Sequence, residues 1–107
     1  LIPNVLNAAI SNQSSLKVFG DDYPTPDGTC VRDYVHVTDL AQAHLLGLEY
    51  MQDKKGFSAF NLGNGDGFSV LEVIKGCEKI ADTKISFQID GRREGDPAGA
   101  DGRFKVP

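Results

Sequence analysis

Two arginines, Arg32 and Arg93, have the side chains and the surroundings that best suggest binding chemistry. Arg32 lies in the sequence V-R-D-Y and Arg93 in the sequence R-R-E-G-D. A guanidinium group donates several hydrogen bonds in a planar fork, and that geometry fits the oxygens of a pyrophosphate. The alternative is that each arginine forms an ordinary surface ion pair, which contributes little. Residue type alone favours this alternative, so the pyrophosphate interpretation depends on the wider pattern.

Short strands and a tight turn are expected around Arg32. Residues 16–19 are apolar enough for a short strand, and residues 21–29 form a turn-rich loop with two prolines and an Asp-Gly pair. Residues 31–37 alternate between two faces, so we expect a third segment in extended conformation. One face carries Val31, Asp33, Val35 and Val37, and the other carries Arg32, Tyr34 and His36. The valine-rich face is expected to be buried, which leaves the arginine face free for a ligand.

Three helices are predicted between and beside these strands. The first covers residues 3–10 with Pro3 in its first turn, the second begins at Thr38 or Asp39 and ends near Gly56, and the third begins at the capping box of Ser69 and Glu72. Residues 57–62 and 85–89 are predicted strands, and residues 91–107 are polar, glycine-rich and expected to be irregular. The order of elements predicts an α/β fold. The expected buried stripes are Leu40, Ala43, Gly47, Leu48 and Met51 on the second helix, and Val70, Val73, Ile74, Cys77 and Ile80 on the third.

Length and composition limit the class of protein. The 107 residues allow one domain, 40% of them are hydrophobic, and the formal net charge is −4. An acidic chain argues against nucleic acid or an anionic membrane as the main partner, and no apolar run is long enough to cross a membrane. Cys30 and Cys77 stand in no metal-binding spacing. They indicate a reduced, cytoplasmic setting, with a single disulfide as the alternative.

Three further patterns are interpreted as coincidental. The glycines of residues 63–67 resemble a dinucleotide-binding loop, but their spacing is one residue short and Asp66 would repel a phosphate. Tyr50 and Lys54 have the Y-x-x-x-K spacing of short-chain dehydrogenases at the end of a predicted helix. His36 and His44 have no cysteine or carboxylate at ligand spacing, so no metal site is predicted.

Residues 20–41 read G-D-D-Y-P-T-P-D-G-T-C-V-R-D-Y-V-H-V-T-D-L-A. Together with the R-R-E-G-D segment, they closely resemble the C-terminal half of the UDP-glucose 4-epimerase family, which belongs to the extended short-chain dehydrogenases/reductases. The resemblance covers residues 1–97. It implies a truncated C-terminal substrate domain that lacks the N-terminal Rossmann domain, followed by a divergent tail at residues 98–107. The resemblance also implies an enzyme of galactose metabolism.

The resemblance assigns roles to seven residues. Arg32 and Arg93 would bind the pyrophosphate of UDP, and Asp96 would accept hydrogen bonds from the ribose hydroxyls. The strand end at Lys17, Val18 and Phe19 would hold the uracil, with the ring of Phe19 on the base. The backbone of Leu1 matches a position that touches the ligand. The alternatives are that Asp96 is only a turn residue before Pro97 and that Phe19 is an ordinary core residue.

The family reaction interconverts UDP-glucose and UDP-galactose, and the bound NAD oxidises C4 of the hexose and returns the hydride to the other face. This chain would supply the residues that bind UDP. We assign it no catalytic, cofactor-binding or metal-binding residue, and we expect it alone to bind no NAD and to be inactive. Its apolar faces should require either the missing N-terminal half or self-association. The alternatives are a non-catalytic nucleotide-binding or interaction module derived from an epimerase, and a chain that has kept no ligand function.

Overall fold

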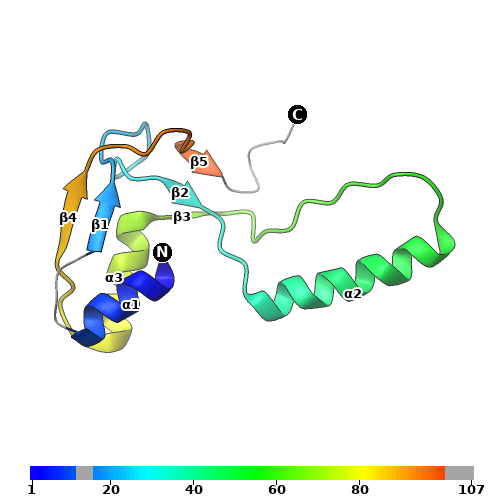
Figure 1. Ribbon diagram of the computed structural model, residues 1–107, viewed down its shortest axis with the longest axis horizontal. Helices are drawn as coiled ribbons and strands as arrows, with labels where there is room; N and C mark the ends of the chain where they lie inside the picture. The colour runs from blue at the N-terminus through cyan, green and yellow to red at the C-terminus, as the bar shows by residue number, and fades with distance from the viewer. Residues whose placement is uncertain (12–15, 101–107) are drawn as a thin grey trace.

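A computed structural model describes residues 1–11 and 16–100, and it confirms the α/β class. Figure 1 shows a body in which helices lie beside short sheets, and from which a long helix and the segment that returns from it extend as an arm. The element order is α1 (Ile2–Ser11), β1 (Leu16–Phe19), β2 (Val31–Arg32), α2 (Val37–Asp53), β3 (Phe68–Ser69), α3 (Val70–Ala81), β4 (Phe87–Asp90) and β5 (Gly99–Ala100).

The core of the body forms between α1, α3 and the parallel pair of β1 and β4, in which Leu16 lies opposite Phe87. The helix α3 begins where the capping box predicted, because the Ser69 Oγ accepts a hydrogen bond from the Glu72 N–H at 3.1 Å. Ile80 is 85% exposed, so the predicted stripe of α3 is buried only in part. The buried cluster consists of Val5, Leu16, Val18, Ile74, Cys77 and Ile85.

The second sheet has the order β3-β2-β5, and it joins three distant parts of the chain. Val31 lies opposite Ser69 in the antiparallel pair and opposite Gly99 in the parallel pair. The predicted strand over residues 31–37 was too long, because only Val31 and Arg32 pair with another strand among the described residues. Val37 is 70% exposed and begins α2, so the predicted burial of the valine face was wrong at that end.

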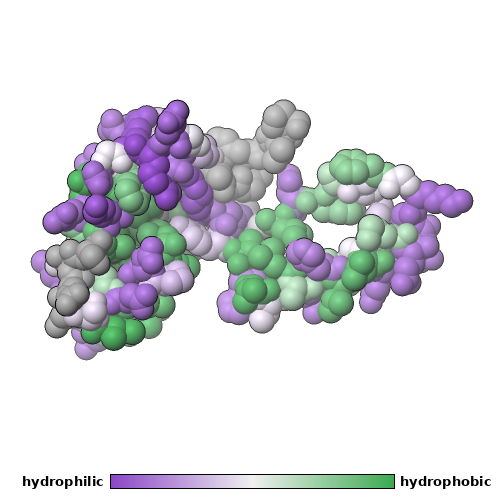
Figure 2. All heavy atoms as spheres, viewed as in Figure 1, coloured by the Kyte–Doolittle hydropathy of each residue, from purple (hydrophilic) through white to green (hydrophobic). Residues whose placement is uncertain are grey.

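The arm differs most from expectation. The N-cap of α2 is His36, whose Nδ1 accepts a hydrogen bond from the Thr38 N–H, so neither Thr38 nor Asp39 caps it. Its C-cap is Lys54 rather than Gly56, and it has no buried residue. Met51 of its predicted inner stripe is 63% exposed. Figure 2 shows apolar side chains at the surface along this arm.

Residues 57–62 form no strand, contrary to prediction, and Phe57 is 93% exposed. A strand needs a hydrogen-bonding neighbour, and no described segment lies beside these residues in a sheet. The expectation that apolar helix and strand faces would be left uncovered is therefore confirmed for the arm. The strand predicted over residues 85–89 forms two residues later, as β4, and its Phe87 and Ile89 are exposed, whereas Ile85 just before it is buried.

Candidate functional site

A cavity of about 540 Å³ lies among α1, the strands β1 and β2, and the segment that contains Arg93 and Asp96. The seven residues predicted to bind a ligand all line this one cavity, although they come from separate segments. They are Leu1, Lys17, Val18, Phe19, Arg32, Arg93 and Asp96. The structure therefore brings the whole predicted set together.

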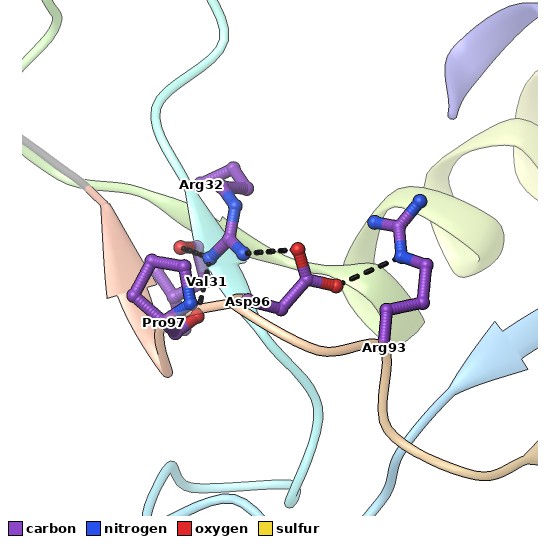
Figure 3. A network of polar contacts seen from close by, with 5 residues as sticks. All are labelled: Val31, Arg32, Arg93, Asp96 and Pro97. Atoms are coloured by element: carbon purple, nitrogen blue, oxygen red, sulfur yellow. Dashed lines mark hydrogen bonds and ion pairs between the residues drawn. The ribbon is translucent and has the colours of Figure 1, made fainter.

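Asp96 lies between the two arginines of the cavity, as Figure 3 shows. Its Oδ2 accepts a hydrogen bond from the Nε of Arg93 at 2.9 Å, and its Oδ1 lies 3.9 Å from the Nη2 of Arg32. The Nη1 of Arg32 also donates to the carbonyl oxygens of Val31 and Pro97, at 2.9 Å each. Two positive charges thus share one carboxylate, and the cluster keeps one excess positive charge.

The guanidinium of Arg93 also lies over the aromatic ring of Phe19, with its central carbon 4.8 Å from the ring centroid. Phe19 ends β1 and is half-buried, so it is a wall of the cavity rather than a core residue. The side chain of Arg93 is 61% exposed, whereas that of Arg32 is 26% exposed. Arg32 is consequently the fixed cation of the cluster and Arg93 the adjustable one.

Arg92 adopts a different role from its neighbour Arg93. Its guanidinium lies 4.2 Å from the ring centroid of Tyr23, and its Nε donates to the Oδ1 of Asp22 at 2.7 Å. This hydrogen bond, which outweighs the opposing effect of burial, holds the pKa of Asp22 below its usual value. Arg92 does not line the cavity. Its contacts with Asp22 and Tyr23 instead join the segment after β4 to the turn at residues 21–29.

Asp27 fixes this turn to the start of α3, and the sequence had indicated only a turn there. Its Oδ1 accepts hydrogen bonds from the N–H and the Oγ1 of Thr29 at 2.9 and 2.7 Å, and its Oδ2 accepts one from the Oγ of Ser69. Burial raises the pKa of Asp27, but the hydrogen bonds from Ser69 and Thr29 outweigh burial and lower it. This carboxylate positions β2, and thereby Arg32, against the N-terminus of α3.

The polar stripe of α1 was also missed. Asn4, Asn7 and Ser11 line the cavity together with Leu1, at intervals of three or four residues. Residues at this spacing share one face of a helix. A row of polar side chains on an otherwise apolar helix is the signal that could have revealed this wall.

The three coincidental patterns gain no support as sites. Two N–H groups of the glycine-rich loop already have a partner, because those of Asn64 and Gly65 donate to the Oδ2 of Asp33 at 2.8 and 3.2 Å. The Tyr50 hydroxyl lies on the arm, 3.5 Å from the Ser58 Oγ and away from the cavity-lining residues. In the described ranges, no three side chains of metal-ligating type come together.

The two cysteines are free and buried, so the alternative of a disulfide is not what the structure shows. Among residues 1–11 and 16–100, no helix has both the length and the apolar character that a membrane span needs.

Comparison with known proteins assigns the chain to a family. The model of the NAD dependent epimerase/dehydratase family matches residues 1–63, more than half of the chain. The chain belongs to this family. Its relatives include the UDP-glucose 4-epimerases of Halalkalibacterium halodurans and Erwinia amylovora, which are 50% and 49% identical over 98 residues.

Solved structures within the family have the same fold. The UDP-glucose 4-epimerase of Bifidobacterium longum in complex with NAD+ and UDP has a TM-score of 0.85 at 49% identity over 92% of this chain. The enzyme of Stenotrophomonas maltophila with bound NAD and formylated UDP-arabinopyranose has a TM-score of 0.85 at 44% identity over 94% of the chain. The match with the two sequence relatives covers 92% of this chain but 29% of each relative. The matches with the two solved structures cover 29% and 30% of those chains. The chain thus spans less than a third of the length of these family members.

Proposed function

We propose that the cavity binds the UDP part of a UDP-sugar and that the chain is the substrate-binding part of a UDP-glucose 4-epimerase. The observation that carries this proposal is the convergence of seven predicted residues on one cavity. The similarity to UDP-glucose 4-epimerases, one of them solved with UDP, supports it. In this proposal residues 1–97 are the C-terminal substrate region, and residues 98–107 are a divergent tail.

The shared carboxylate explains how the cavity would accept a pyrophosphate. Phosphate oxygens can replace Asp96 as the partner of Arg93, because that side chain is exposed and free to reorient. Arg32 stays fixed by two carbonyl oxygens and offers its remaining donors. Asp96, released from Arg93, is then available to accept hydrogen bonds from the ribose hydroxyls.

The walls of the cavity would hold the nucleoside. The ring of Phe19 offers an aromatic face, and base–aromatic stacking is worth roughly 1–3 kcal/mol. The main chain of Lys17 and Val18 lies beside it and can read the edge of uracil. The backbone of Leu1 closes the cavity at the start of α1.

The glycine-rich loop at residues 63–67 does not suit the pyrophosphate of NAD. The loop already binds the carboxylate of Asp33, and a Cβ added at Gly63 would lie 2.3 Å from the Oδ2 of Asp33. We therefore assign the redox chemistry of the family to residues outside this chain, and we expect no turnover from the chain alone. The uncovered arm would be covered either by the rest of a full-length enzyme or by a second copy. A cytoplasmic setting fits the two free thiols.

Neighbouring arginines provide the test. In Arg93→Ala, the affinity for UDP should fall by about one to two orders of magnitude, because a hydrogen bond to a charged group contributes roughly 1.5–3 kcal/mol. In Arg92→Ala, the affinity should change little, because Arg92 does not line the cavity. Titrations of UDP and uridine followed by NMR shifts measure both.

The loss for Arg93→Ala should be much smaller for uridine, which has no phosphate. Equal losses for the two ligands would show that Arg93 has only a structural role. If neither ligand shifted any resonance of the unmutated chain, the proposed function would be wrong.

A further inference from the structure

Tyr34 lines the cavity together with Arg32, from which it is separated by one residue. Both residues are half-buried. Among residues 1–11 and 16–100, the hydrogen bond at Tyr34 uses its carbonyl oxygen, and none uses its hydroxyl. The wall of the cavity therefore contains a phenol whose O–H can donate a hydrogen bond to a ligand.

The main chain holds Tyr34 in place. Its carbonyl oxygen accepts a hydrogen bond from the Nδ2 of Asn64 at 2.8 Å. The carboxylate of the preceding residue, Asp33, accepts hydrogen bonds from the N–H groups of Asn64 and Gly65. A tyrosine side chain has two rotatable angles, so a tyrosine on a fixed main chain loses little conformational entropy when it binds a ligand.

The charge of Arg32 acts on the Tyr34 hydroxyl. Burial raises the pKa of Tyr34, and the positive charge of Arg32 opposes this shift in part. The hydroxyl is thus a protonated donor at neutral pH, and it lies within the field of a guanidinium that two carbonyl oxygens hold in place. A hydroxyl and a guanidinium in one wall suit the oxygens of a phosphate, because hydrogen bonds to an ionised acceptor are the strong ones.

The side-chain contacts give the binding residues an order along the cavity. The guanidinium of Arg93 lies over the ring of Phe19, and Asp96 joins Arg93 to Arg32, as Figure 3 shows for the last three. Tyr34 follows Arg32 and stands at the opposite end of this series from Phe19. With the base on Phe19, the phosphate farther from the nucleoside lies at Arg32 and Tyr34.

We propose that Tyr34 is a further binding residue of the cavity, and that its hydroxyl donates a hydrogen bond to the distal phosphate of a nucleoside diphosphate held by Arg32. The inference rests on the proposed function, because that function supplies the acceptor. It also gives the bound molecule a direction. The distal phosphate and any group that it carries lie beside residues 33–35, where the arm leaves the body.

The experiment removes the hydroxyl and keeps the ring. NMR titrations of the unmutated chain and of Tyr34→Phe compare UDP, UDP-glucose, UMP and uridine. The affinities for UDP and UDP-glucose should fall by about tenfold, because one hydrogen bond to a charged group is lost. The affinities for UMP and uridine, which lack the distal phosphate, should stay within about twofold, and this also shows that the variant keeps its fold.

Tyr50→Phe is the matched control, because the Tyr50 hydroxyl lies on the arm, 3.5 Å from the Ser58 Oγ. Its affinities for all four ligands should equal those of the unmutated chain. Similar losses for all four ligands in Tyr34→Phe would overturn the proposal, because the hydroxyl would then only support the wall. A loss for UDP-glucose without a loss for UDP would also overturn it, because the hydroxyl would then contact the sugar.

The two levels of the argument can fail separately. If the unmutated chain binds UDP and Tyr34→Phe binds it equally well, the role of Tyr34 is wrong and the proposed function stands. If the unmutated chain binds none of the four ligands, the proposed function is wrong, and the role of Tyr34 falls with it.

Discussion

Removal of the Asp27 carboxylate should destabilise the chain far more than its exposed position suggests. The carboxylate accepts hydrogen bonds from Thr29 and Ser69, which are 0% and 2% exposed. Asp27→Ala leaves these buried donors without their acceptor, and each unsatisfied buried group costs about 1–3 kcal/mol. Water can reach the outer side of the site and recover part of this loss. We therefore expect the free energy of unfolding to fall by about 2–4 kcal/mol.

Two variants sharpen the test. Asp27→Asn keeps one acceptor oxygen for Thr29 and loses the charge, so its effect should be about half as large. Asp22→Ala is the matched control in the same turn, because Asp22 forms only an exposed ion pair with Arg92. Such pairs contribute little to stability.

The way in which the stability contributed by Asp27 changes with pH is an independent test. The folded-state pKa of Asp27 is lowered, so its stabilisation is present above the unfolded value of about 3.9 and is lost as pH falls through the folded value. Urea unfolding followed by circular dichroism at pH 7 and pH 3 should therefore show a smaller difference between the unmutated chain and the Asp27→Asn variant at the lower pH. An effect of Asp27→Ala no larger than that of Asp22→Ala would refute the reasoning, as would a difference that grows on acidification.

Three further predictions concern the cavity, the turn and the arm. Asp96→Asn should strengthen the binding of inorganic pyrophosphate by roughly fivefold, because Arg93 loses its competing partner, and it should weaken the binding of uridine. Calorimetry measures both affinities, and a lower affinity for both ligands would contradict this prediction. Gly28→Ala should destabilise the chain by about 1–3 kcal/mol more than Gly56→Ala in urea unfolding. Both glycines have positive φ, but a Cβ at Gly28 would lie 2.0 Å from the Asp21 oxygen, whereas that at Gly56 meets nothing within 4 Å. Leu48→Glu on the uncovered face of α2 should shift the chain towards monomer in light scattering without lowering its unfolding free energy. If the chain associates and the variant leaves its mass distribution unchanged, this face of α2 is not the contact between copies.

Features that depend on neighbouring residues were predicted well from the sequence. The strand over residues 16–19, the turn at residues 21–29 and the capping box at Ser69 all follow from local rules, and the structure confirms them. The convergence of Arg32 and Arg93 followed from a resemblance between motifs. No local rule places side chains so far apart in the sequence in one cavity.

Features that depend on distant partners were missed or misjudged. Residues 57–62 have the composition of a strand but no neighbour to pair with among the described segments, so they form none. The role of Asp27 was invisible because its partner Ser69 lies 42 positions away. His36 displaced Thr38 as the cap of α2 because an imidazole nitrogen can accept a hydrogen bond as a hydroxyl can.

The hydrogen bonds from Asn64 and Gly65 to Asp33 have a consequence for the architecture of the whole chain. They tie the point where the arm leaves the body to the point where it returns, which makes the arm a side branch with a closed base. Each residue that lines the cavity lies outside residues 36–62. The branch is thus a separable module, and a short linker between residues 35 and 63 would shorten the chain while leaving the walls of the cavity intact.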